Sequence, residues 1–307
     1  MLLPARSRDQ QDDEGECPAC ASRQGRVRSG GRDEPVILCE QCGTTFYKRP
    51  IKQKHDYGTY YPYLDGYDDR EYLAQLDLRR SRFLSQLREI EGLNPPGRRL
   101  VDFGAGPGYF CAIAREAGWD AAGIDSSHVA ADAGSTAFQV PFVSLEDLED
   151  GSCSVITAFH VIEHLDDPAA ILRKLHGKLK PGGILVVHVP NRESLSSLIG
   201  FWCKRMLGRP VTRSGCLYYP EHLTGFTESG LIACASRARF AAVRMRECSL
   251  FSRHYDSWLI PTYLSGLKRR PLMGAWRLSR LMLSGLIDLI GEPIGRGDWL
   301  VAHFRSQ

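Results

Sequence analysis

The sequence predicts an α/β protein with a doubly wound parallel sheet, preceded by a small cysteine-rich module. Strand-like and helix-like segments alternate between residues 100 and 189 with short connections, a pattern typical of parallel sheets. Within this region an apolar run leads into glycines at alternate positions, Gly104, Gly106 and Gly108. Such glycines allow a sharp turn from strand to helix with no side chain between backbone and ligand. Two Cys-x-x-Cys pairs stand upstream.

The size and composition are those of one large domain with an appendage. The chain has 307 residues and a net charge of +3, which does not indicate a polyanionic partner such as nucleic acid. The N-terminus lacks the apolar core of a signal peptide, and the longest apolar stretch, residues 281–290, falls short of the about 20 residues that span a bilayer. The ten cysteines therefore indicate thiols or metal ligands, and we expect a cytoplasmic protein.

The N-terminal cysteines predict a zinc ribbon over residues 17–55, after a disordered tail over residues 1–16. Cys17-Pro-Ala-Cys20 and Cys39-Glu-Gln-Cys42 are separated by 18 residues, a spacing typical of four-cysteine zinc sites. Four thiolates would close the coordination sphere of Zn²⁺ and leave no position for water, so the predicted zinc is structural. The alternative is four unrelated buried cysteines.

Residues 56–95 are predicted to form a tyrosine-rich linker and a helix that covers the sheet. The tyrosines of the linker either reach the active-site mouth or, as we favour, pack the ribbon onto the main domain. From about residue 70 apolar residues recur on one helical face, with Asp69 as a plausible N-cap and Gly92 as a stop.

The core is predicted over residues 96–248, with its last strand contributed by residues 296–307. Strands are expected at residues 100–103, 119–124, 140–143, 154–159 and 184–189, helices at 109–117 and 167–179, and an antiparallel strand at 298–304. This pattern is Rossmann-like, and such sheets bind ligands beyond the carboxyl ends of their strands. Four polar residues fall at or just past predicted strand ends: Asp102, Asp125, Glu146 and His160.

Two insertions, residues 194–220 and 249–295, mix apolar residues with lysines and arginines. We expect them to form helical lids on the core. A basic amphipathic lid is suited to peripheral contact with an anionic membrane, at its inner face, or to a diphosphate-bearing substrate. The alternative is that they are ordinary core helices with arginine borders.

Residues 156–168, which contain Phe159-His-Val-Ile-Glu-His164, and residues 179–191, which contain Pro181-Gly-Gly, carry a family resemblance. With the glycine motif, they resemble class I S-adenosylmethionine (SAM) methyltransferases of types 11 and 23. They are similar in particular to quinone O-methyltransferases and to zinc-ribbon deoxysugar methyltransferases. One departure is Cys153-Ser154, where such families usually carry Phe-Asp; we expect it to affect strand packing only.

The resemblance implies that the glycine turn holds the methionine portion of SAM, that Asp125 holds the ribose, and that Leu145 and Glu146 flank adenine. Phe159 and His160 would border the methyl-transfer site, and the two insertions would form lids over the acceptor, as similar segments do in such enzymes. Asp125 also stands where an acidic residue usually accepts ribose hydroxyls, although an ordinary turn aspartate is the alternative. The predicted cofactor-binding residues are Asp102, Gly104, Gly106, Gly108, Asp125, Leu145, Glu146 and Phe159.

Methyl transfer requires an aligned nucleophile and, for many acceptors, a base. Residues 218–227 resemble a segment of deoxysugar C-methyltransferases in which a Glu-His pair serves the acid/base step, which implies His222 as base and Glu221 as its partner. The alternative is that this segment merely anchors its loop. His160 is the second catalytic candidate, and His164 beside Glu163 is a third, although capping and packing explain that pair as well.

The predicted function is methyl transfer from SAM to a small-molecule acceptor: a sugar, a quinone or phenol, a lipid-linked molecule or a secondary metabolite. RNA methylation is the first alternative. Enzymes that methylate base amino groups carry an Asn/Asp-Pro-Pro-aromatic motif where this chain has Phe159-His-Val-Ile, and the ribbon is not strongly basic. The second alternative is a SAM-binding zinc-ribbon protein that mediates interactions without catalysis. No motif fixes the acceptor atom or the oligomeric state.

Overall fold

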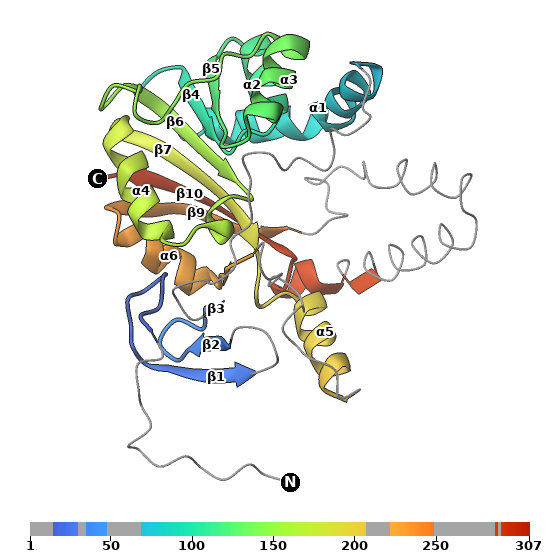
Figure 1. Cartoon of the computed structure of the whole chain (residues 1–307), viewed down its shortest axis with the longest axis vertical. Helices are drawn as coiled ribbons and strands as arrows, with labels where there is room; N and C mark the ends of the chain where they lie inside the picture. Colours follow the sequence, from blue (N-terminus) through green and yellow to red (C-terminus); the bar gives the residue numbers. More distant parts are fainter. Residues whose placement is uncertain (1–14, 30–34, 48–68, 207–221, 249–285, 288–289) are drawn as a thin grey trace, which may run out of the picture.

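The computed structural model describes residues 15–29, 35–47, 69–206, 222–248, 286–287 and 290–307 (Figure 1). The predicted N-terminal tail, the tyrosine-rich linker and Glu221 therefore lie outside the described residues, as do most of the second insertion and the end of the first.

The core is a six-stranded sheet in the order β5-β4-β6-β7-β10-β9. Its parallel part comprises β5 (Asp120–Ile124), β4 (Arg99–Phe103), β6 (Cys153–Phe159) and β7 (Leu179–Pro190). The expected antiparallel strand near the C-terminus is β10 (Trp299–Ser306), which lies between β7 and β9 (Phe240–Cys248). The doubly wound α/β prediction is confirmed, although the sequence analysis did not identify β9.

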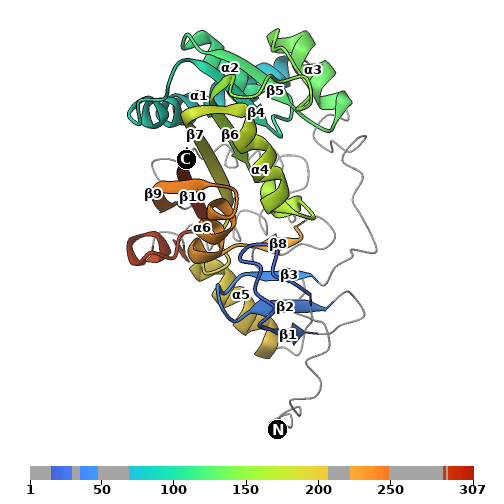
Figure 2. The ribbon, with the colours of Figure 1, turned by 90° about the vertical axis from the view of Figure 1, so that its left-hand side faces the viewer.

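Helices cover both faces of this sheet (Figures 1 and 2). On one face, α1 (Asp69–Glu91) and α2 (Tyr109–Glu116) pack on Val155, Ile184 and Val186. On the other face, α4 (Pro168–Lys178) and α6 (Glu228–Ser236) pack on Leu185 and Val187. The described residues also form helix α3 (His128–Phe138), which was not expected from the sequence, and the 3-10 turns η2 (Ile162–His164) and η3 (Glu292–Ile294).

The prediction of a strand at residues 140–143 is wrong. The chain there makes a single parallel bridge, between Gly123 and Phe142. The Gly123 amide donates to the Pro141 carbonyl at 2.9 Å, and the Val143 amide donates to the Gly123 carbonyl at 3.0 Å. Pro141 has no N–H to extend the ladder, so pairing stops after this contact.

The cysteine-rich module shares its sheet with the core. Strands β1 (Gly25–Ser29), β2 (Val36–Cys39) and β3 (Thr45–Tyr47) form an antiparallel sheet whose fourth strand, β8 (Thr224–Gly225), comes from the core chain. The hydroxyls of Thr227 and Ser229 donate to the Cys42 carbonyl at 2.6 and 2.9 Å. These bonds fix the module against the start of α6, at one end of the molecule (Figure 2).

The described part of the first insertion is helix α5 (Leu195–Met206). It exposes Ile199, Trp202 and Met206, which lie on one helical face because they are three and four residues apart. No helix among the described residues is both long and apolar enough to cross a bilayer. Contact of this face with a membrane stays a prediction.

One carboxyl group lies inside the sheet. Asp102 on β4 is 4% exposed, and its Oδ1 accepts a hydrogen bond from the Thr157 hydroxyl on β6 at 2.6 Å. Burial raises the pKa of Asp102 to about 7; the Thr157 bond lowers it and the nearby Asp125 charge raises it. Near neutral pH the folded chain therefore binds a proton that the unfolded chain has released.

We expect stability to fall between about pH 4 and pH 7, because the unfolded aspartate ionises over this window while folded Asp102 stays protonated. Asp102→Asn removes this decline, which approaches roughly 4 kcal/mol by linkage. Urea unfolding at a series of pH values measures it. Asp120→Asn, at an exposed position on β5, is the control and keeps the wild-type decline. An unchanged pH dependence in Asp102→Asn would contradict the prediction.

The contact between the module and α6 predicts opposite effects for two helical glycines. A Cβ at Gly230 would overlap the Thr44 hydroxyl, whereas a Cβ at Gly177 on α4 meets nothing within 4 Å. Gly230→Ala should destabilise the protein by about 1–3 kcal/mol through overpacking. Gly177→Ala should stabilise it by roughly 0.5–1 kcal/mol, since alanine favours helix. Denaturant unfolding compares them, and equal effects would show that the module is not packed on α6.

Candidate functional site

The glycine turn between β4 and α2 has the predicted backbone. Gly104, Gly106 and Gly108 have φ of 78°, 54° and 75°, all in the left-handed region that favours glycine. The Gly104 amide donates to the Ile124 carbonyl at 2.7 Å, which holds the turn against the end of β5. A Cβ on Gly104 would overlap the side chain of Val161. The turn therefore lies directly beside the segment that follows β6.

Asp125 stands at the carboxyl end of β5, as expected. Its Oδ2 accepts from the Gly106 amide at 2.6 Å, and its Oδ1 accepts from the Ser127 amide at 2.8 Å. Each carboxylate oxygen has a further lone pair, so Asp125 can hold the glycine turn and still accept a ligand hydroxyl.

The two residues predicted to flank adenine lie in the turn after Phe142, next to the end of β5. The Leu145 side chain is buried at 9% exposure, while Glu146 is exposed. Leu145 therefore packs in the hydrophobic core from this turn, whereas the Glu146 side chain faces solvent.

Phe159 and His160 end β6 beside the turn. The Phe159 ring packs against Phe110 at 5.0 Å and His188 at 4.2 Å between centroids, so it points toward the α1 and α2 face. His160 has a φ of 58°, and its amide donates to the His188 carbonyl at 2.9 Å. Its ring lies 4.5 Å from the Trp299 ring. A left-handed residue other than glycine stores strain, and such residues gather at functional sites.

Three histidines surround one buried carboxylate, a group that we call the histidine–glutamate cluster: His160, Glu163, His164 and His222. Oε1 of Glu163 lies 3.7 Å from His160 Nδ1 and 3.9 Å from His164 Nε2. The rings of His164 and His222 are 4.7 Å apart. Burial raises the pKa of Glu163, but the three histidines outweigh burial and leave this pKa below its ordinary value. Glu163 is therefore an ionised, fully buried carboxylate.

Among the residues that the structure describes, the carboxylate beside His222 is that of Glu163. The Leu223 amide donates to the Glu163 carbonyl at 2.8 Å, and this bond joins the His222 loop to η2. The sequence analysis paired His222 with Glu221, which lies outside the described residues, and offered capping as one use of Glu163. The coordinating atoms of Glu163, His164 and His222 lie within 4.8 Å of one another, so they could also hold a divalent ion.

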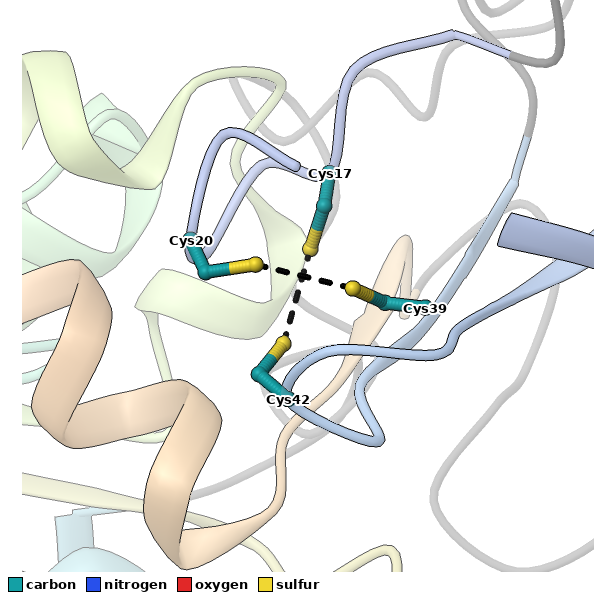
Figure 3. Close-up of side chains that lie close together, drawn as sticks. All are labelled: Cys17, Cys20, Cys39 and Cys42. Carbon is teal, nitrogen blue, oxygen red and sulfur yellow. Dashed lines mark hydrogen bonds between the residues drawn. The ribbon is translucent and has the colours of Figure 1, made fainter. Parts of the chain in front are cut away.

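The four module cysteines converge on one point (Figure 3). The Cys17 and Cys42 sulfurs are 3.7 Å apart, and those of Cys20 and Cys39 are 3.5 Å apart. Four sulfurs around Zn²⁺ at about 2.3 Å would be separated by about 3.8 Å, which these distances match. All four are thiols rather than disulfides. The donor set therefore fits a tetrahedral zinc ion, as the sequence predicts.

Curated relatives match parts of this chain. Ubiquinone biosynthesis O-methyltransferase of Methylococcus capsulatus is 28% identical over 44% of this chain and 62% of its own length. The protein of the same name from Ralstonia nicotianae is 29% identical over 60% of this chain and 71% of its own length. That of Paracidovorax citrulli is 30% identical over 36% of this chain and 51% of its own length. The chain thus spans between about half and three quarters of the length of these relatives.

Two solved structures share the fold. Phosphoethanolamine N-methyltransferase 2 of Haemonchus contortus, in complex with SAM, has a TM-score of 0.53 at 15% identity and covers 92% of this chain and 71% of its own. A putative sarcosine dimethylglycine methyltransferase of Galdieria sulphuraria has a TM-score of 0.50 at 17% identity, covering 82% and 94%. At these identities the likeness concerns the fold alone.

The family model described as "Methyltransferase domain" matches residues 72–253, which is more than half of the chain and includes the glycine turn and the histidine–glutamate cluster. The protein belongs to this methyltransferase family and has the class I SAM methyltransferase fold.

Proposed function

We propose that this protein transfers a methyl group from SAM to a small-molecule acceptor. The observation that carries the proposal is the contact between the two halves of the site. Gly104 packs against Val161, so the glycine turn lies beside the segment that contributes His160, Glu163 and His164. A cofactor cradle and a group of proton acceptors thus meet at one edge of the sheet, as methyl transfer requires.

The glycine turn and Asp125 form the cofactor half of the proposed site. The turn presents backbone without side chains, and Asp125 keeps free lone pairs for the ribose hydroxyls. Leu145 offers an apolar surface for adenine, with Glu146 at its rim. Asp102 is buried on β4 and bonded to Thr157, so it would support the glycine turn from the adjoining strand without touching SAM. When bound, SAM supplies an electrophilic methyl group on its sulfonium.

The histidine–glutamate cluster forms the acceptor half. We assign His222 as the base: a ring nitrogen takes the proton that the acceptor releases when it is methylated. The Glu163 carboxylate, which lies within 4.8 Å of a His222 ring nitrogen, stabilises the resulting imidazolium by its negative charge. His160, held in a left-handed conformation at the end of β6, orients the acceptor.

Two likenesses favour different classes of acceptor. Relatives named for ubiquinone biosynthesis favour a phenol or quinone. The resemblance of residues 218–227 to deoxysugar C-methyltransferases favours a sugar. Incubation of the protein with methyl-labelled SAM and an extract of its source cells separates the two, because a quinone carries the label into organic solvent and a sugar leaves it in water. Absence of label from every fraction would overturn the proposal of catalysis.

The cysteine module has a proposed structural role at the same site. Cys42 is held by Thr227 and Ser229, β3 pairs with β8, and β8 begins two residues after His222. A zinc ion that closes the four-cysteine site would stiffen this module and thereby fix the loop that carries the base. The ion would take no part in the chemistry, since its coordination sphere is full.

We expect one zinc ion per chain, lost in Cys42→Ser. Without the ion the melting temperature and label transfer both fall, the latter by about tenfold or more, whereas SAM affinity changes by less than about threefold. Metal analysis, thermal unfolding and SAM titration measure these quantities. Cys203→Ser, at an exposed thiol on α5, is the control and retains its zinc. Zinc-free wild-type protein with full activity would refute the structural role.

We expect His222→Ala to lower the rate of label transfer by about 100-fold or more, the usual worth of a general base. SAM affinity should stay at the wild-type level, because His222 lies outside the cofactor half. Glu163→Gln should also lower the rate, since the amide carries no charge to stabilise an imidazolium. His128→Ala, at an exposed histidine on α3, is the control. A normal turnover in His222→Ala would remove His222 as the base.

A further inference from the structure

Glu163 carries a buried carboxylate whose hydrogen bonding is incomplete. Its side chain is fully buried, and among the described residues neither Oε1 nor Oε2 finds a hydrogen-bond partner. Two other carboxylates near the glycine turn are bonded: Asp102 accepts from Thr157, and Asp125 accepts from two backbone amides. Buried polar atoms are almost always paired, so an unpaired carboxylate indicates a water molecule or an ion that completes it.

Histidine nitrogens stand around this carboxylate at distances that a metal ion would bridge. Oε1 of Glu163 lies 3.9 Å from His164 Nε2, which is too long for a hydrogen bond. Two ligand atoms at about 2.1 Å from one ion are about 3.4 Å apart at a tetrahedral angle and at most about 4.2 Å apart. The distance between Glu163 and His164 falls within this range. A His222 ring nitrogen, within 4.8 Å of both, enters the range after a shift of at most about 0.6 Å.

The backbone holds the three side chains in this arrangement. Glu163 and His164 are neighbours in η2, where the His164 amide donates to the Val161 carbonyl at 3.0 Å. The bond from the Leu223 amide to the Glu163 carbonyl, at 2.8 Å, brings His222 to them. Each histidine would give one ring nitrogen to an ion, so its other nitrogen can keep a hydrogen-bond partner, as in most metal-binding histidines.

An ion can reach this group from solvent. The Glu163 carboxylate is buried, but the side chains of His160 and His164 are 30% and 21% exposed, and His222 is half-buried. Three protein ligands would leave at least one position of a tetrahedral ion for water. The group is therefore an open site, unlike the four-cysteine site, whose ligands close the coordination sphere.

The donor set discriminates between metals. Two imidazoles and one carboxylate suit divalent transition ions such as Zn²⁺, Fe²⁺, Co²⁺ and Ni²⁺. Mg²⁺ and Ca²⁺ prefer ligand sets made of oxygen. With three protein ligands in place of four thiolates, we expect this site to fill only after the cysteine module has taken its zinc.

We propose that Glu163, His164 and His222 form a second metal site, which binds a divalent transition ion and thereby blocks methyl transfer. A neutral imidazole has one basic nitrogen, and a nitrogen bonded to a metal has no lone pair left to accept a proton. A bound ion would therefore remove His222 as the base. This consequence rests on the proposed function, whereas the binding of the ion does not.

The binding test uses Co²⁺ as the probe, because its visible absorption reports its ligands. Co²⁺ is added to protein whose cysteine site already holds zinc, so binding at the second site gives visible bands without the charge-transfer absorption of cobalt thiolates. One equivalent should bind to the wild type and to His128→Ala, at an exposed histidine on α3 that serves as matched control.

In Glu163→Gln and in His164→Gln the affinity for Co²⁺ should fall by at least about tenfold, since loss of an outer-shell partner alone costs that much. Two variants keep the test decisive if one of them does not fold. Absence of Co²⁺ binding in the wild type, or equal binding in the wild type and both variants, would overturn the metal site.

The turnover test asks what the ion does to methyl transfer. Saturating Zn²⁺, beyond the equivalent held by the cysteine module, should lower label transfer by about 100-fold, as loss of a general base does. Mg²⁺ at the same concentration should leave the rate unchanged. In His164→Gln the Zn²⁺ concentration that halves the variant's own rate should rise by about tenfold or more.

Stimulation of label transfer by Zn²⁺ would overturn both the block and the role of His222 as the base, while leaving the ion site intact. If no label is transferred with or without added metal, the proposed function fails, and Co²⁺ binding alone decides the metal site.

Discussion

The hydrogen bond from the Gly106 amide to Asp125, with the Gly104 bond to the Ile124 carbonyl, is the constraint on which the site depends. Together they hold the glycine turn at the carboxyl end of two adjacent parallel strands. A turn with three left-handed residues would otherwise sample many conformations, because glycine loses the most backbone entropy on ordering. The same carboxylate that anchors the turn keeps lone pairs for a ligand, so in the proposed site one side chain would both order the loop and bind the cofactor.

The proposed acceptor half of the site depends on contacts between segments that are distant in sequence. The His222 loop reaches Glu163 through the Leu223 amide and then enters β8, which completes the sheet of the cysteine module. The module is thus continuous with the acceptor side of the core. In the proposed role, a zinc ion bound by its four sulfurs would join two segments of the module, and the order that it imposes would pass along β3 and β8.

Much of the architecture could be predicted from the sequence because its determinants are local. Apolar runs fixed the strands at β4, β6 and β7, and the spacing of the four cysteines predicted a donor set that the structure brings together. The prediction of a short strand at residues 140–143 was wrong because it considered only the apolar pattern, whereas Pro141 lacks the N–H that a longer ladder needs. Helix α3 was missed because its small residues give only a weak amphipathic pattern.

The sequence by itself determined the fold class, the glycine turn and the position of Asp125, since each follows from residue type and short-range spacing. Only the tertiary structure brought Glu163 beside His222 and placed polar side chains of α1 over those of the sheet. Glu163 and His222 are far apart in the chain, as are Glu89 on α1, Arg246 on β9 and His303 on β10. Their encounters depend on how helices pack on a sheet and on strand register, and neither is encoded in a local pattern.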